Sequence, residues 1–100
     1  MLYYTQLIFI KPGYEQEFHL FEEKVIPLLK GHNGELIYRI RPDKSSVIES
    51  NRELPYEIHL VAFKSVADFE SYKNDPERLS FIDLKNKSVK NIILIEGREI

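Results

Sequence analysis

The stretch PYEIHLVAF, residues 55–63, alternates between two kinds of side chain and predicts a β-strand. One set is apolar and consists of Tyr56, Ile58, Leu60 and Ala62. The other set mixes two ionisable residues with two apolar ones: Glu57, His59, Val61 and Phe63. Successive side chains of a strand point to opposite faces of its sheet. We therefore expect the apolar set to face a core and the mixed set to face away from it.

The segments on either side of this strand complete a recognisable order. Further strands are predicted for residues 3–10, 35–41 and 91–97. A first helix is predicted for residues 14–28. A second helical region follows an N-cap at Ser65 and restarts at Asp75. The order β-α-β-β-α-β predicts the ferredoxin-like α+β fold, an antiparallel sheet with both helices on one face. In this topology the first and third strands are central. One hundred residues fit one such domain, residues 1–100.

Local signals fix several element ends. Pro27 lies inside the first helical pattern and predicts a bend or an irregular last turn, because an interior proline removes a backbone hydrogen bond. Ser65, with Asp68 three residues later, matches a capping box, and Asp75 before Pro76 predicts a second N-cap. Residues 43–54 are mostly polar and predict a long loop or a hairpin extension.

Composition excludes several classes of function. The net charge of −2 argues against general nucleic-acid binding, which needs a basic excess. An RNA-recognition domain needs stacking aromatics on its third strand, where Ile58 and Leu60 stand instead. The chain has no cysteine, which excludes disulfides and thiolate metal sites. No apolar run is long enough for a membrane span and no signal-peptide pattern is present, so we expect a cytoplasmic protein without membrane contacts.

The two faces of the sheet are assigned from the same alternation. The face covered by helices is predicted to carry Leu7, Phe9, Leu36, Tyr38, Ile40, Ile58, Leu60 and Ala62. The open face is predicted to carry Tyr4, Gln6, Ile8, Ile10, Ile37, Arg39, Arg41, Glu57, His59, Val61 and Phe63, together with two aliphatic residues of the fourth strand. This second face is too apolar to be left in water. We expect a second copy of the chain to cover it, forming a homodimer with a pocket between the two sheets.

Three segments carry a resemblance to a known superfamily: FIKPGYEQEF, PLLKGHNGELIYR and PYEIHLVAFKSVADFESYKNDPER. With the last strand they cover nearly the whole chain, which resembles the dimeric α/β-barrel superfamily and is most similar to domain-of-unknown-function family number 1330. The superfamily includes haem-degrading oxygenases, cofactor-independent monooxygenases and lactone isomerases. Haem-degrading members use an asparagine, a tryptophan and a histidine. Gln6 falls at the asparagine position, but the chain has no tryptophan, so haem degradation is not expected.

The candidate site residues come from the mixed face. His59 is the candidate general base or proton donor, and Glu57, two residues away, would orient its ring or raise its pKa. Gln6, Arg39 and Tyr4 are the candidate ligand-binding residues. For each residue a structural explanation stays open: Glu57 and His59 as a buried polar pair, Arg39 in an ion pair with Glu57, Gln6 in a subunit contact. Arg41 is expected to be solvated, His32 to cap a helix and His19 to be exposed.

Two classes of function remain. One is a cofactor-independent oxygenase or isomerase acting on a small enolisable or aromatic molecule. The other is a dimeric ligand-binding or regulatory module without catalysis. The three histidines lie on different elements, so we expect no metal site, and the sequence implies no cofactor. Replacing His59 by alanine separates the two classes, because only an enzyme would lose catalysis while keeping its dimer.

Overall fold

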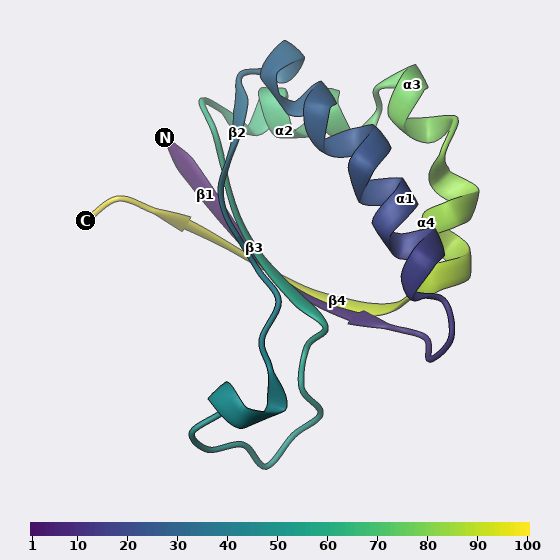
Figure 1. The fold of residues 1–100 in the computed structure, drawn as a ribbon. Helices are drawn as coiled ribbons and strands as arrows, with labels where there is room; N and C mark the ends of the chain where they lie inside the picture. The colour runs from purple at the N-terminus through teal and green to yellow at the C-terminus, as the bar shows by residue number, and fades with distance from the viewer.

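A computed structural model describes residues 1–100. Ten elements follow one another along the chain (Figure 1). In order they are β1 (Leu2–Ile10), α1 (Glu15–Val25), the 3-10 helix η1 (Ile26–His32), β2 (Gly34–Ile40), the 3-10 turn η2 (Lys44–Ser46), β3 (Glu57–Phe63), α2 (Val66–Lys73), α3 (Pro76–Leu79), α4 (Ile82–Ser88) and β4 (Val89–Arg98). The second predicted helix is thus divided into three short ones. None of the helices combines the length and the apolar character needed to cross a bilayer.

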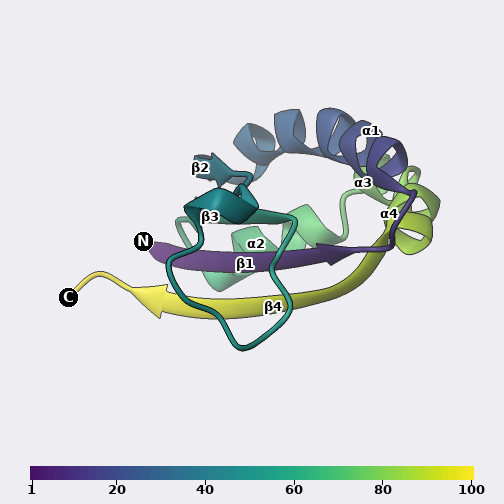
Figure 2. The same cartoon turned by 60° about the horizontal axis from the view of Figure 1, so that its bottom comes forward.

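The four strands form one antiparallel sheet in the order β2-β3-β1-β4. The first and third strands are central, as predicted. The sheet curves around the helices, which all lie on its concave side (Figures 1 and 2). The fold is therefore ferredoxin-like, and the predicted fold class is confirmed.

The predicted element ends are also found. The α-helix stops at Val25, and Pro27 stands in the first turn of η1, where its missing N–H costs nothing. Asn33, with φ of 54°, ends η1 in the left-handed conformation. The Ser65 hydroxyl accepts a hydrogen bond from the Asp68 N–H at 3.1 Å, and Asp75 accepts from the first turn of α3.

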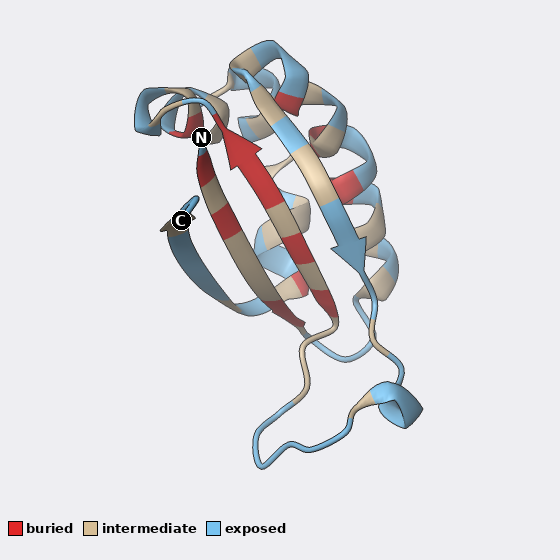
Figure 3. Cartoon of the chain, turned by 90° about the vertical axis from the view of Figure 1, so that its left-hand side faces the viewer, coloured by how far each residue is buried: buried red, intermediate tan, exposed pale blue.

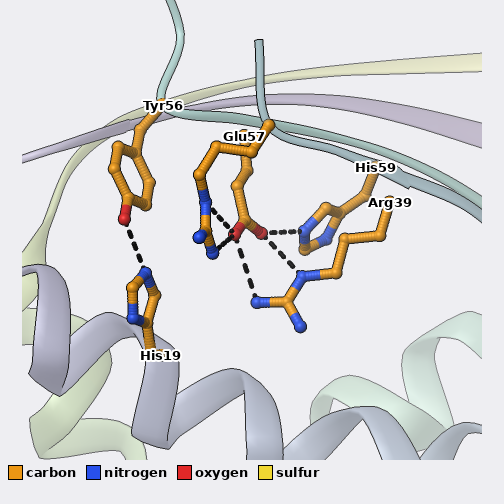
Figure 4. A network of polar contacts seen from close by, with 6 residues as sticks. His19, Arg39, Tyr56, Glu57 and His59 are labelled. Carbon is orange, nitrogen blue, oxygen red and sulfur yellow. Dashed lines mark hydrogen bonds and ion pairs between the residues drawn. The ribbon is translucent and has the colours of Figure 1, made fainter. Parts of the chain in front are cut away.

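The assignment of the two sheet faces was wrong. Glu57, His59, Val61 and Phe63 are all buried, and they lie under the helices of their own chain. Figure 3 shows buried residues alternating along the two central strands, and Figure 4 shows the side chains of Glu57 and His59 pointing toward α1. Alternation alone could not reveal this, because both sets contain large apolar residues.

A β-bulge divides the predicted residues of β2 between the two faces. The register shifts between Leu36, which pairs with Val61, and Tyr38, which pairs with Leu60. Paired residues of an antiparallel ladder lie on the same face. Leu36 therefore stays on the helix side, as predicted, whereas Tyr38 lies on the open face, contrary to prediction. Arg39 pairs with His59 and is on the helix side.

The open face of the sheet is strongly apolar. Its apolar residues are Tyr3, Leu7, Phe9, Tyr38, Ile40, Ile58, Leu60, Ala62, Ile93 and Ile95, and it also carries Thr5, Glu35 and Asn91. Four of these side chains, Tyr38, Ile40, Ile93 and Ile95, are between 44% and 60% exposed. Phe9 and Ala62 are buried nonetheless. The loop of residues 41–56 projects beyond the sheet, away from the helices (Figure 1).

Candidate functional site

Glu57 is the centre of a polar cluster between the sheet and α1. Its side chain is 1% exposed. Arg39 donates to it from Nε at 2.8 Å and from Nη2 at 3.2 Å, and Arg41 donates from Nε at 3.1 Å and from Nη2. The His59 Nε2 lies 2.8 Å from the Glu57 Oε1 (Figure 4). The carboxylate is thus held from three sides.

These donors determine the ionisation of Glu57. Burial by itself would raise the pKa of this carboxyl, but the hydrogen bonds from His59, Arg39 and Arg41 together outweigh it and hold the pKa at about 2. The predicted ion pair between Arg39 and Glu57 therefore forms within one chain. Arg41 is half-exposed but also bonds to Glu57, so its predicted solvation holds only in part.

His59 lies beside a small cavity. The cavity has a volume of about 50 Å³ and lies between the helix side of the sheet and α1, η1, α2 and α3. Its polar lining residues are Gln6, Glu22, His59 and Arg78. A hydrogen bond from the His59 Nε2 to an ionised Glu57 favours the tautomer with its proton on Nε2. The Nδ1 makes no hydrogen bond within the chain, which leaves its lone pair available to a ligand.

Glu22 is a site residue that the sequence analysis missed. It lies on α1 and is 8% exposed, and it makes no hydrogen bond or ion pair within the chain. Burial raises its pKa, while the nearby charges of His59 and Arg39 partly oppose that change. Glu22 follows Phe18 by four residues, which places it on the apolar stripe of the helix. This spacing is the feature of the sequence from which the burial of Glu22 could have been predicted.

The other two predicted ligand residues differ in their surroundings. Gln6 lies on β1, lines the cavity and makes no side-chain hydrogen bond within the chain. Tyr4 is 2% exposed; its ring stacks on Phe69 with ring centres 4.0 Å apart, and its hydroxyl donates to Glu96 at 2.8 Å. Burial and that hydrogen bond raise the pKa of Tyr4 to about 12. Tyr4 therefore belongs to the core cluster, and it is absent from the cavity lining.

The remaining histidines lie outside the cavity lining. The His19 Nε2 is 2.6 Å from the Tyr56 hydroxyl, so His19 is half-buried instead of exposed (Figure 4). His32 bonds to Asp75 at 2.6 Å and to Ser71 at 2.8 Å, tying η1 to α2 and α3, while the helix-ending role predicted for it falls to Asn33. No three histidine, aspartate or glutamate side chains converge as a metal site would require.

The fold and cluster define a ferredoxin-like protein with a small polar cavity beneath its helices. No protein-family model matches the chain, and no curated protein sequence matches it. Membership of the unknown-function family suggested by the sequence therefore stays a prediction.

Solved structures give clear matches in fold. A NIPSNAP family protein of unknown function from Agrobacterium tumefaciens has a TM-score of 0.71 at 20% identity, over 97% of this chain and 86% of that one. A DABB family protein with a ferredoxin-like fold from Mesorhizobium loti has a TM-score of 0.68 at 14% identity, over 99% and 96%. A dimeric protein of unknown function with a ferredoxin-like fold from Bacteroides fragilis has a TM-score of 0.71 at 10% identity, over 98% and 95%. At these identities the likeness concerns the fold.

Proposed function

We propose that the chain is a cofactor-independent enzyme that moves a proton on a small enolisable molecule bound between His59 and Glu22. The observation that carries this proposal is the Glu22 side chain, 8% exposed and without a hydrogen bond or ion pair, beside a cavity that His59 also lines. Buried carboxyls without partners are costly, and raised pKa values cluster at functional sites. This site lies within one chain, in contrast to the pocket between two sheets that the sequence suggested.

The roles follow from the contacts of His59 and from the opposite pKa shifts of the two carboxyl groups. The His59 Nδ1 accepts a proton from the carbon beside a carbonyl group. The imidazolium that forms is stabilised by the ionised Glu57, 2.8 Å from its Nε2. Glu22, whose pKa is raised, donates a proton to the developing enolate oxygen. Arg39 and Arg41 keep Glu57 ionised, so they position the base without touching the substrate.

Two reactions share this first step. Isomerisation returns the proton to a different carbon, whereas cofactor-independent oxygenation lets the carbanion react with O₂. We assign isomerisation, because the cavity lining offers both an acid, Glu22, and a base, His59, for the two proton transfers that this reaction needs. Consumption of O₂ in an electrode cell together with substrate loss would assign oxygenation instead.

The test is hydrogen–deuterium exchange. Small 2-oxo and 3-oxo carboxylic acids and neutral ketones are incubated with the protein in D₂O and followed by ¹H NMR. We expect exchange to fall by about 10²-fold or more in Glu22→Gln and in His59→Gln, the range for loss of general acid–base catalysis. Glu23→Gln, at the exposed next position on α1, should leave exchange unchanged.

The competing function is a ligand-binding module without catalysis. It is favoured by the Glu57 cluster, because the contacts to Arg39, Arg41 and His59 would stabilise the fold even in a protein without catalysis. If members of the panel bind, as seen in amide shifts of cavity residues, yet no exchange exceeds the buffer rate, this alternative replaces the enzyme. Equal exchange in wild type and Glu22→Gln would also contradict the assigned roles.

We further propose that two copies pair through the open sheet face, giving a dimeric α/β barrel. Support comes from the exposed apolar side chains of that face and from the structural neighbour described as dimeric. Sedimentation velocity should show a dimer for the wild type and a monomer for Ile93→Lys. Ile48→Lys is the matched control, because Ile48 is fully exposed on the projecting loop. If only Ile48→Lys dissociates the dimer, the interface lies at that loop instead of the open sheet face.

A further inference from the structure

A second cavity lies next to the first and is lined by positive charge. It has a volume of about 100 Å³ and is bounded by β1, β4, α2, α3 and α4. It shares Gln6, Phe69, Tyr72 and Arg78 with the first cavity. Its charged lining residues are Lys73, Arg78 and Lys85, and no acidic residue lines it.

Of these three basic residues, only Lys73 forms an ion pair with a carboxylate. Lys73 has a carboxylate partner, Glu70 at 3.0 Å, and both side chains are about half-exposed. Lys85 makes no hydrogen bond or ion pair within the chain. Arg78 donates from Nη1 to the Lys73 carbonyl at 3.2 Å, while its buried Nε has no partner. The Arg78 guanidinium also lies over the Tyr72 ring, with its Cζ 5.1 Å from the ring centre. Its Nε lacks an acceptor, which an oxyanion would supply, because the Nε and Nη2 edge of a guanidinium binds an oxyanion with two parallel hydrogen bonds.

The two nearby acidic residues, Glu22 and Asp75, do not form ion pairs with the lysines and the arginine of this cavity. Glu22 lines the first cavity and forms no ion pair with Arg78 or Lys85. Asp75 is bonded to His32 and to the first turn of α3. Burial and then the charge of Arg78 lower the pKa of Lys85; Glu22 opposes this change, and the charge of Lys73 adds the smallest effect. A bound anion would relieve this repulsion.

We propose that this basic cavity is an oxyanion subsite, formed by Arg78, Lys85 and Lys73, that holds the carboxylate or phosphate group of a ligand whose reacting part lies between Glu22 and His59. The inference rests on the proposed function and narrows the substrate to a small anionic molecule. The cavity has room for one such group, and the four shared lining residues place the two cavities side by side.

The test uses inorganic phosphate and acetate as probes. The ¹⁵N-labelled protein is titrated with each anion at constant ionic strength, with chloride as the balancing ion. We expect saturable shifts of the Arg78 Nε–H signal and of backbone amides in α3 and α4. The tighter-binding probe identifies the group: phosphate alone indicates a phosphate ester, and acetate binding indicates a carboxylate.

Matched variants locate the binding. Lys85→Met should weaken binding at least tenfold, whereas Lys87→Met, an exposed lysine of the same helix, should not change it. Lys85→Met removes a repulsive charge, so its Tm without phosphate should equal or exceed that of the wild type, which shows that it is folded. Absence of saturable shifts in the wild type, or equal affinity in Lys85→Met, would overturn the proposal.

The outcomes also separate this inference from the proposed function. Glu22→Gln should lose proton exchange but still bind phosphate. Phosphate binding that depends on Lys85, without proton exchange on any compound, would leave the subsite standing and remove the enzyme. Proton exchange on a neutral ketone, without binding of either anion, would support the enzyme and remove the oxyanion subsite.

Discussion

Replacing Glu57 by glutamine tests the electrostatics of the site most directly. The substitution keeps the size of the side chain but removes the charge that Arg39, Arg41 and His59 surround. Two guanidinium groups and an imidazole would then meet at a neutral amide in a largely buried place. Loss of one partner from a buried ionic cluster leaves the other charges uncompensated, which is strongly destabilising.

The magnitude follows from the ionisation of the carboxyl. The pKa of Glu57 is about 2, against an ordinary value of 4.5. Because one pKa unit equals 1.36 kcal/mol, the cluster contributes about 3 kcal/mol to the free energy of unfolding at neutral pH. The folded-state pKa is depressed, so this contribution is complete above about pH 4.5 and is lost as the pH falls toward 2. We expect Glu57→Gln to lose about 3 kcal/mol at pH 7 and almost nothing near pH 2.

Urea unfolding followed by circular dichroism measures this difference. Wild type and variant are compared at several pH values and at one protein concentration, because pairing of chains would add to the apparent stability. Glu53→Gln is the control: its ion pair with Lys90 is exposed, and pairs of this kind contribute up to about 1 kcal/mol. A difference below about 1 kcal/mol for Glu57→Gln at pH 7, or one that persists unchanged to pH 2, would refute the reasoning.

Three further predictions concern packing and backbone, each measured by urea unfolding. Gly34→Ala should cost about 1–3 kcal/mol, because the new Cβ would lie 2.6 Å from Cε1 of the buried Phe63, whereas Gly31→Ala has open space and should cost little. Asn33→Ala should be less stable than Asn33→Gly by about 1 kcal/mol, since φ is 54° there; equal stabilities would show that this turn relaxes. Tyr4→Phe should cost about 1 kcal/mol through its lost hydroxyl hydrogen bond, and an unchanged midpoint would mean that water replaces it.

The sequence predicted the fold because several boundaries had a local cause. Proline ended the first α-helix, serine and aspartate capped α2 and α3, and alternation marked the strands. These effects act within a few residues and need no knowledge of what packs where. The order of elements then left few topologies to consider.

The faces of the sheet could not be predicted in the same way. In β3, both alternating sets contain bulky apolar residues, so local pattern gives no preference. Burial of the set with Glu57 and His59 becomes possible only because Arg39 and Arg41 arrive from the neighbouring strand to neutralise the carboxylate. The β-bulge after Leu36 contributes to this arrangement by changing the register of β2 before Arg39. Neither effect can be read from residues 55–63 alone.

The candidate site was predicted in part. His59, Glu57 and Arg39 do come together, and Gln6 lies beside them in the cavity lining. Glu22 was missed because a glutamate on a helix is usually exposed, although its spacing from Phe18 placed it inside. Arg78 was missed because α3 is short, so no stripe of apolar residues indicated which of its sides faces the sheet.

The position of the ionic cluster argues for a role beyond stability. Well-packed apolar residues of similar volume often stabilise a protein as well as a buried ion pair does. What such residues could not do is keep an ionised carboxylate against one nitrogen of His59 while leaving the other nitrogen free beside a cavity. The two carboxyl groups near this imidazole have pKa values shifted in opposite directions: the pKa of Glu57 is lowered and the pKa of Glu22 is raised. That separation is what proton transfer near neutral pH requires, because one group must stay charged while the other exchanges its proton.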